Sequence, residues 1–233
     1  MFFRLGDIFE EVSMKGLFDI VGPVMIGPSS SHTAGAARLG LMALKILGEP
    51  VVKAEILLHG SFAKTYRGHG TDKALLAGIM GFEPEDDRIR NAIDIAKERK
   101  LEFSFDTVDL MDAHPNTAIL KLTGESGKCT TIEGSSIGGG NIVINRIDAF
   151  EVHLTGQYPA LVVVQKDKPG LINKITGVLA LYEINVAYMR VFRQKRGQEA
   201  MMILETDEDL TDDVLKACRV ASGVITAFAI PAI

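Results

Sequence analysis

The stretch ALVVVQKDKPGLINKITGVLALY, residues 160–182, decides the fold of the second half of the chain. Its apolar start over Ala160–Gln165, with three consecutive valines, predicts a buried strand. Asp167–Gly170 contains Pro-Gly and predicts a turn, and the apolar spacing within Leu171–Tyr182 predicts a helix. A strand, a turn and a helix therefore open this half of the chain.

The residues after this stretch complete a βαββαβ order. The predicted elements are a hairpin of strands Val186–Gln194 and Gln198–Thr206 across Lys195–Gly197, a helix Thr211–Ala221 and a strand Val224–Ile230. This order is the split-βαβ, ferredoxin-like pattern. We therefore expect a C-terminal domain over residues 159–233, reached through a linker at Gly156–Pro159.

The first two thirds of the chain mix helical and strand periods and predict an α/β domain over residues 1–155. The predicted helices are Thr33–Leu47, Asp72–Met80 and Arg88–Lys100, and the predicted strands are Val52–Leu58, Leu101–Phe105, Ala118–Leu120 and Ile142–Ile144. We expect these strands to close over a pocket. The whole chain is thus predicted to be an α/β (α+β) protein of two domains.

Composition and charge exclude several classes of function. A formal net charge of -5 over 233 residues argues against nucleic-acid binding, which requires a basic surface. The sequence has no apolar run long enough to span a membrane and no signal-peptide pattern, so we expect a cytoplasmic protein that binds no membrane. Its two cysteines, Cys129 and Cys218, form no metal or redox motif, and we predict no metal site within this chain.

The run Gly27-Pro28-Ser29-Ser30-Ser31-His32-Thr33 precedes the first predicted helix. One serine suffices to cap a helix, so the others leave hydroxyl donors beside the free N–H groups and the positive end of the helix dipole. Such a helix start favours a small anion such as a carboxylate. The alternative is a solvated loop that offers more capping serines than the helix needs.

Three further segments carry polar groups that suit a binding site. Gly68-His69-Gly70 places an imidazole where neither neighbour blocks a ligand, and His114-Pro115-Asn116 offers a restricted histidine beside an amide. The run from Ser135 to Gly140 ends in three glycines that allow close approach of a ligand. Surface or hairpin loops explain each segment equally well when it is taken alone. His59 and His153 have no supporting pattern, and we expect no chemistry from them.

Taken together and in this order, the serine-rich run, the Gly68–Asp72 segment and the Ser136–Gly140 segment resemble the iron–sulfur-dependent L-serine dehydratases (L-serine ammonia-lyases). The whole chain looks most like the β subunit of the two-chain bacterial form, with Leu161–Ile230 similar to an ACT regulatory domain. The resemblance implies conversion of L-serine to pyruvate and ammonia without pyridoxal phosphate, in amino-acid catabolism and gluconeogenesis. It also implies a [4Fe–4S] cluster held by three cysteines. Because this chain has only two, the cluster is expected on an α-subunit partner.

The resemblance also implies roles for individual residues. His69 matches the candidate base for the α-proton of serine, and His114 matches a second active-site histidine. The residues expected to bind substrate are Ser29, Ser30, Ser31, His32, Thr33, Asn116, Ser136, Gly138 and Gly139.

In the ACT domain, Asp167, Gly170 and Asn185 fall at effector-binding positions of the serine-sensing domains of phosphoglycerate dehydrogenases. Asp167 stands where those sensors have asparagine, and its charge disfavours an effector carboxylate. A purely dimerising ACT domain is therefore an alternative, and either reading implies a homodimer through this domain.

Two other functions remain to be weighed against the enzyme subunit. The same architecture serves a non-catalytic serine-binding regulatory module, since phosphoglycerate dehydrogenases carry related domains. A pyridoxal-phosphate enzyme is disfavoured because Lys64 and Lys73 lack the phosphate-binding glycine loop that a Schiff-base lysine needs.

Overall fold

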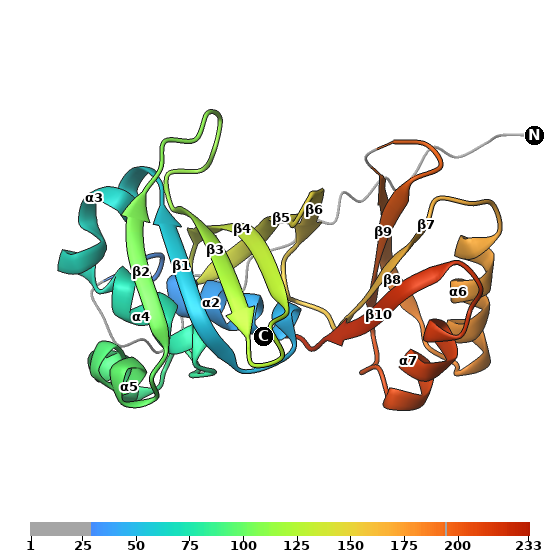
Figure 1. Cartoon of the computed structure of the whole chain (residues 1–233), viewed down its shortest axis with the longest axis horizontal. Coiled ribbons are helices and arrows are strands. Elements are labelled where there is room, and N and C mark those ends of the chain that lie inside the picture. Colours follow the sequence, from blue (N-terminus) through green and yellow to red (C-terminus); the bar gives the residue numbers. More distant parts are fainter. Residues whose placement is uncertain (1–28, 194) are drawn as a thin grey trace, which may run out of the picture.

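The computed structural model describes residues 29–193 and 195–233. Gly27 and Pro28 of the serine-rich run, and Gln194 of the predicted hairpin, lie outside the described residues. The described chain forms two sheets side by side, each packed against its own helices (Figure 1).

The N-terminal domain holds a six-stranded sheet. Its elements are α2 (Ala34–Leu47), β1 (Val51–Leu58), α3 (Gly60–His69), α4 (Thr71–Ile79), the 3-10 helix η1 (Asp87–Asn91), α5 (Ala92–Glu98), β2 (Glu102–Thr107), β3 (Thr117–Gly124), β4 (Cys129–Gly138), β5 (Asn141–Ile147) and β6 (Phe150–Leu154). The strand order is β2-β1-β3-β4-β5-β6. β1 pairs in parallel with β2, and every other pair is antiparallel.

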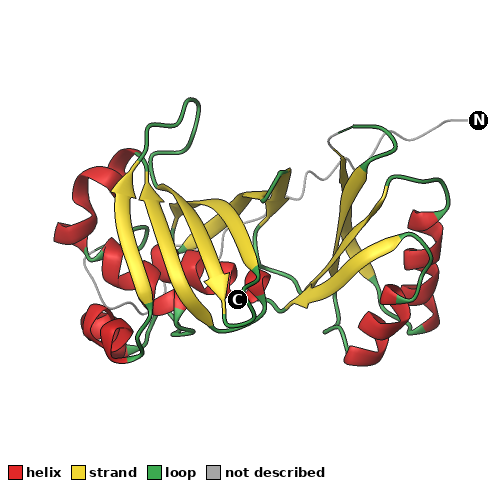
Figure 2. Cartoon of the chain, viewed as in Figure 1, coloured by secondary structure: helices red, strands yellow, loops and turns green. Residues whose placement is uncertain are grey.

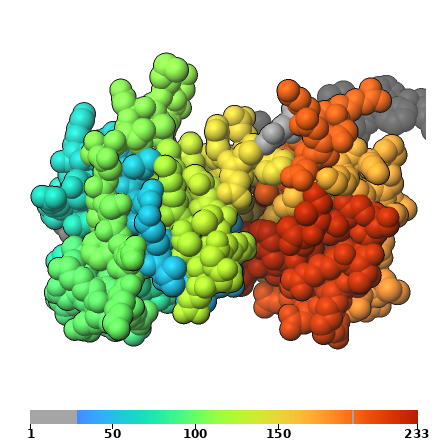
Figure 3. Space-filling view, viewed as in Figure 1, coloured from blue at the N-terminus to red at the C-terminus, as the bar shows by residue number. Residues whose placement is uncertain are grey.

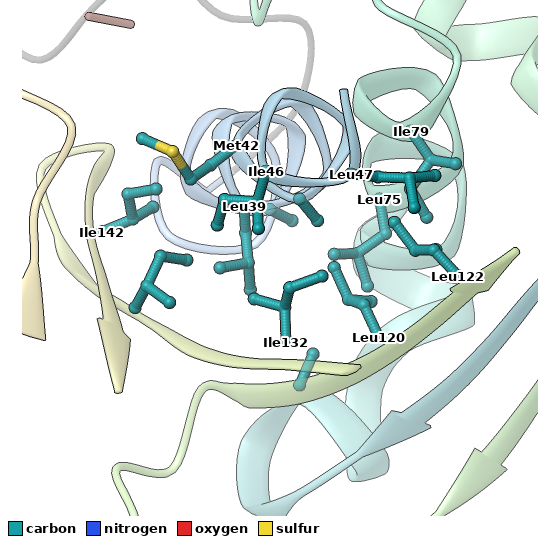
Figure 4. Close-up of a cluster of buried hydrophobic side chains, with 14 of the residues drawn as sticks. Leu39, Met42, Ile46, Leu47, Leu75, Ile79, Leu120, Leu122, Ile132 and Ile142 are labelled. Carbon is teal, nitrogen blue, oxygen red and sulfur yellow. The ribbon is translucent and has the colours of Figure 1, made fainter. Parts of the chain in front are cut away.

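This sheet is open, with β2 and β6 as its two edges. The expectation that the strands close over a pocket is therefore wrong. The core lies instead between one sheet face and the helices α2 and α4, as Figure 4 shows. Leu39 and Ile46 of α2 point toward Leu120 and Ile132 of the sheet, and Leu75 of α4 completes the layer.

α2 and α4 cross closely because each carries a glycine at the crossing. A Cβ atom on Gly40 would lie 2.3 Å from the carbonyl oxygen of Leu75, and one on Gly78 would lie 2.0 Å from that of Ala37. Only glycine allows two helix backbones to approach so closely. The crossing fixes α2 against α4, and therefore fixes where the first turn of α2 lies.

The C-terminal domain confirms the predicted βαββαβ order. Its elements are β7 (Ala160–Lys166), α6 (Leu171–Leu181), β8 (Val186–Arg193), β9 (Glu199–Thr206), α7 (Asp212–Arg219) and β10 (Val224–Ile230), in the strand order β10-β7-β9-β8. α6 and α7 cover the sheet face turned away from the N-terminal domain (Figure 2). On the opposite face, Val162, Met201 and Ile203 join the hydrophobic core cluster of the N-terminal domain.

Some predicted elements differ from the structure. The helix expected over Arg88–Lys100 is divided into η1 and α5, because the Asp86 side chain accepts the Arg88 backbone N–H and begins a separate short helix. The residues expected to form a turn at His59-Gly60 and a loop around His69 instead bound α3, whose single fully buried side chain is Phe62. β4 and β6 were not predicted. β4 contains few alternating apolar residues, whereas β6 does alternate Phe150, Val152 and Leu154 with polar residues, so its strand pattern was missed.

Candidate active site

Most of the predicted site residues lie at one end of the N-terminal sheet, where β1 and β2 finish. β1 ends at Leu58, the chain turns at His59 into α3, and the turn that precedes α2 lies beside this point. Because β1 and β2 pair in parallel, β2 ends at the same end of the sheet, with Leu58 opposite Thr107. Residues far apart in the sequence are therefore brought to one place.

The serine-rich turn does not cap α2 as the sequence suggested. Thr33, not a serine, is the N-cap residue, and its side chain makes no capping hydrogen bond. The backbone N–H of Thr33 donates to the Ser29 carbonyl at 2.9 Å, and that of Gly35 donates to the Ser30 carbonyl at 2.8 Å. These two N–H groups are occupied by the turn itself and are not available to an anion.

His32 is held by a serine on each side of its ring. Its Nδ1 atom lies 3.1 Å from Ser29 Oγ, and its Nε2 atom lies 3.2 Å from Ser61 Oγ. The His32 backbone N–H also donates to Ser29 Oγ at 3.4 Å. Each ring nitrogen therefore faces a serine hydroxyl that can donate or accept, as the tautomer of the ring requires.

His32 also packs against His69 and Phe62. The ring centroids of His32 and His69 are 5.0 Å apart in an edge-on arrangement, and those of His32 and Phe62 are 5.3 Å apart. Burial lowers the pKa of His32 below its ordinary value, and repulsion from a charged His69 lowers it further. His32 is 8% exposed, whereas His69 lies exposed at the last residue of α3. The pair therefore joins a buried neutral imidazole to an accessible one.

Buried polar atoms without a hydrogen-bond partner lie near this pair. They are Thr33 Oγ1, Ser136 Oγ and Asn116 Oδ1. Ser136 packs against the first turn of α2, because a Cβ atom on Gly35 would lie only 2.0 Å from its hydroxyl oxygen. Asn116 and Ser136 are joined by a backbone hydrogen bond of 3.0 Å. An unpaired buried polar atom costs free energy, so these groups suit a polar ligand.

The structure does not place His114 beside His69. His114 is exposed, and its Nδ1 atom accepts the Asn116 backbone N–H at 3.1 Å. It lines a hollow of about 380 Å³ on the other face of the sheet, together with Ser135 and Asn145. Because Ser135 and Ser136 alternate along β4, their side chains point to opposite faces. His114 and the His32–His69 pair thus lie on opposite faces of the sheet.

The predicted glycine loop is a tight β4–β5 hairpin turn. Gly138, Gly139 and Gly140 all have positive φ angles, between 62° and 106°, which glycine adopts without strain. Arg38 of α2 donates from Nη1 to the Gly140 carbonyl at 3.4 Å. Gly138 and Gly139 therefore lie at the end of the hairpin, whereas Ser136 lies within the strand.

Ser61 is a site residue that the sequence did not indicate. Besides its contact with His32, its backbone N–H donates to the Pro115 carbonyl at 2.7 Å. Ser61 therefore links the turn before α2, the start of α3 and the segment that carries His114. No motif surrounds Ser61, and only the unpredicted helix α3 could have identified it. His59 has a structural role, since its Nδ1 atom accepts the Leu110 backbone N–H at 3.2 Å.

The three candidate effector residues of the C-terminal domain do not meet within one chain. Asp167 follows β7 and accepts hydrogen bonds from the Gly197 backbone N–H at 2.8 Å and from Arg193 Nη1 at 3.2 Å. The Gly197 N–H and then Arg193 lower its pKa. Asn185 lies at the opposite end of the sheet, where its amide donates to Asp207. Gly170 is the N-cap of α6 and is exposed.

No three or more His, Cys, Asp or Glu side chains within residues 29–193 and 195–233 are arranged to hold a metal ion. Over the same ranges, no helix is long and apolar enough to cross a membrane.

The fold and this site define the class of protein. It is a two-domain α/β protein that gathers hydroxyls and imidazoles at the start of α2, followed by a ferredoxin-like domain. Sequence comparison then gives the family. The profile described as "Serine dehydratase beta chain" matches residues 13–146, and that described as "ACT domain" matches residues 160–220. The chain therefore belongs to the serine dehydratase beta chain family, as its motifs predicted.

Individual relatives agree with this assignment. The chain is 45% identical over 201 residues to "Probable L-serine dehydratase, beta chain" of Bacillus subtilis, which covers 86% of this chain and 91% of the relative. It is 37% identical to "L-serine dehydratase, beta chain" of Peptoniphilus asaccharolyticus, over 86% of this chain and 90% of the relative. It is also 30% identical to "D-3-phosphoglycerate dehydrogenase" of Bacillus subtilis, over 78% of this chain but 34% of that protein.

Among solved structures, the ACT domain from GTP pyrophosphokinase of Chlorobium tepidum matches with a TM-score of 0.27 and 23% identity, covering 30% of this chain and 94% of that one.

Proposed function

We propose that this chain is the substrate-binding subunit of an L-serine ammonia-lyase, which forms pyruvate and ammonia from L-serine together with an α chain. Family membership and relatives of matching length that are named L-serine dehydratase beta chain support the proposal. The observation that carries it is the pair of buried, unpartnered hydroxyls of Thr33 and Ser136 near the His32–His69 contact.

The serine carboxylate binds at the first turn of α2 in this proposal. Thr33 and Ser136 supply hydroxyl donors that lack protein partners, and Ser30 and Ser31 lie partly exposed beside them. The positive end of the α2 dipole adds a favourable field for the anion. Ser29 contributes indirectly, since its hydroxyl orients His32. The Asn116 amide oxygen, which has no protein partner, accepts a hydrogen bond from the substrate ammonium, while Gly138 and Gly139 border the site.

His69 is assigned as the base that removes the α-proton of serine. It is accessible at the end of α3, and it lies against a neutral His32 that does not compete for the proton. His114 is assigned as a second acid–base group. Within this chain His114 lies on the other face of the sheet from His69, so this role requires that assembly with the α chain brings it to the substrate.

This chain does not fit an iron–sulfur cluster. Cys129 is exposed in β4 and Cys218 is buried in α7, so the two thiols lie in different domains, and three thiolates are needed. A hydroxyl group leaves carbon poorly, so elimination of water needs an electrophile as well as a base. We assign that electrophile, a [4Fe–4S] cluster, to the α chain and invoke no pyridoxal phosphate. The residues described here bind serine and move its proton.

The alternative is a non-catalytic serine-binding regulatory module. It is favoured by the 30% identity to a D-3-phosphoglycerate dehydrogenase, which extends over 78% of this chain. Such a module binds serine without any cysteine-bearing partner, whereas the enzyme subunit turns serine over only with one.

The C-terminal domain is proposed to dimerise and to bind an effector, and the protein to act in the cytoplasm in serine catabolism that feeds gluconeogenesis. Asp167 is committed to the hairpin of its own chain, which weighs against its binding an effector directly. Gly170 and Asn185 form an effector site only if a second chain brings them together, because they lie at opposite ends of one sheet.

Anaerobic reconstitution tests the proposal. The chain is purified with and without a cysteine-bearing α chain from the same organism, and pyruvate formation from L-serine is measured. We expect turnover only from the pair, and loss of turnover in His69→Ala with the complex intact. Serine binding without turnover in any pairing favours the regulatory module. Unchanged turnover in His69→Ala removes that residue from the reaction.

A further inference from the structure

A loop stands clear of the molecule at the candidate site. It connects β2 to β3 over residues 108–116 and is called here the projecting loop; Figures 1 and 3 show it rising above the sheet edge. Met111 lies at its tip and is 96% exposed. An apolar side chain held fully in water gains nothing from folding of the chain alone.

The projecting loop is anchored at its base. The Val108 backbone N–H donates to the Leu58 carbonyl at 2.9 Å, and that of Leu110 donates to His59 Nδ1 at 3.2 Å. At the other end, Thr117 Oγ1 donates to the His114 carbonyl at 2.6 Å. The loop is thus held in place before any partner arrives, which lowers the entropy cost of binding.

A second exposed apolar side chain lies beside the loop. Ile137 of β4 is 50% exposed and lines the same 380 Å³ hollow as Ala113 and His114. In the described part of the N-terminal domain, only Val52, at the start of β1, is another strongly exposed large apolar residue. Exposed apolar groups therefore gather around His114, and exposed apolar clusters mark interaction surfaces.

The loop and the end of β2 before it are also acidic. Asp106, Asp109 and Asp112 lie between residues 106 and 116, and that stretch has no lysine or arginine. The Asp109 side chain is fully exposed. A surface that fits this loop thus combines an apolar pocket with cationic side chains at its border.

Resting on the proposed function, we propose that the projecting loop and the hollow beneath it form the docking surface for the cysteine-bearing α chain. Met111 and Ile137 are its apolar anchors. Continuity with the candidate site selects this occupant. The loop carries His114, and its Pro115 carbonyl binds the backbone N–H of Ser61, which contacts His32. A chain that covers Met111 therefore also lies next to His114 and to the segment that supports Ser61.

Binding measurements test the surface without relying on turnover. The α chain is immobilised under anaerobic conditions, and the affinity of wild type, Met111→Asp and Ile137→Asp is measured. We expect each variant to bind at least about tenfold more weakly, as anchor residues do. Val220→Asp is the matched control, because Val220 is 83% exposed on the C-terminal domain, and it is expected to bind within about twofold of wild type. Asp109→Lys with Asp112→Lys is expected to weaken binding and reduce its dependence on salt.

The outcomes separate this inference from the proposed function. Equal binding by wild type, Met111→Asp and Ile137→Asp overturns the docking surface and leaves the subunit assignment standing. Failure of wild type to bind the α chain at all overturns both. The third outcome concerns this chain alone in a sedimentation experiment. If wild type self-associates and Met111→Asp does not, the loop is a contact between two copies of this chain, and the inference is overturned.

Discussion

Replacement of Gly40 by alanine tests the helix crossing that positions the site. In the middle of an exposed helix, glycine to alanine stabilises by about 1 kcal/mol through helix propensity. At Gly40 the new Cβ atom would lie 2.3 Å from the Leu75 carbonyl oxygen and 2.9 Å from the Ile79 nitrogen. Both contacts are backbone atoms, so no side chain can turn away. α2 and α4 must separate by about 1 Å to restore ordinary contact distances.

Overpacking of this kind costs about 1–3 kcal/mol, which offsets or exceeds the propensity gain of about 1 kcal/mol. We expect Gly40→Ala to lower the free energy of unfolding by up to about 2 kcal/mol, or the Tm by up to about 8 °C. Gly177→Ala is the matched control: Gly177 lies within α6, and no atom lies within 4 Å of its added Cβ. It should stabilise the protein by up to about 1 kcal/mol.

Thermal and urea unfolding of the two variants, followed by circular dichroism, measure the difference. Equal stabilisation by Gly40→Ala and Gly177→Ala would refute the reasoning, because it would mean that α2 and α4 do not approach closely. A serine affinity in Gly40→Ala that matches wild type despite lower stability would show that the crossing does not place the first turn of α2.

Three further predictions concern single side chains. Burial and His69 lower the pKa of His32, so NMR titration should give His32 a pKa below 6.5, and His69→Ala should raise that pKa part of the way toward 6.5. Since the native state then binds fewer protons than the unfolded chain, this group should lower stability as the pH falls below about 6.5, a slope that His32→Gln should remove. Ser61→Ala should lower kcat/KM by about tenfold and change the His32 ¹⁵N tautomer shifts, with recovery in Ser61→Thr; unaltered shifts would contradict the assigned hydrogen bond. Burial raises the pKa of Glu205, partly offset by Arg190 and His153, so Glu205→Gln should raise the Tm by about 2–4 °C at pH 7.5. That gain should disappear as the pH falls through the raised pKa toward 4.5, and exposed Glu98→Gln should show no gain at any pH.

The C-terminal half of the fold could be predicted because each break carries its own turn residues. Pro169-Gly170 ends the first strand segment, Gly197 marks the hairpin, and the observed strands and helices lie within two residues of the predicted bounds. α3 could not be predicted, because it buries only Phe62 completely and therefore shows no apolar stripe. Glycines at Gly60 and Gly68 also made its sequence typical of a loop.

The site was predicted in its residue types more than in its arrangement. The Ser29–Thr33 turn lies at the start of a helix as expected, but its backbone N–H groups at Thr33 and Gly35 are already used. The contact of His32 with Ser61 joins residues 29 positions apart, and no local pattern contains such a contact. Likewise, His114 and His69 are assigned to opposite faces of the sheet by the alternation of side chains along β4, and β4 was not predicted.

The apolar core shared by the two sheets couples the two described domains despite their two family profiles. Val162, Met201 and Ile203 pack into the same apolar cluster as the helices of the N-terminal domain, and Ile233 donates its backbone N–H to the Gly156 carbonyl at 3.0 Å. A truncation at the linker would expose that face to water. Any ligand that stiffens the C-terminal sheet would therefore also raise the free energy of opening the serine-rich turn, with no displacement needed between them.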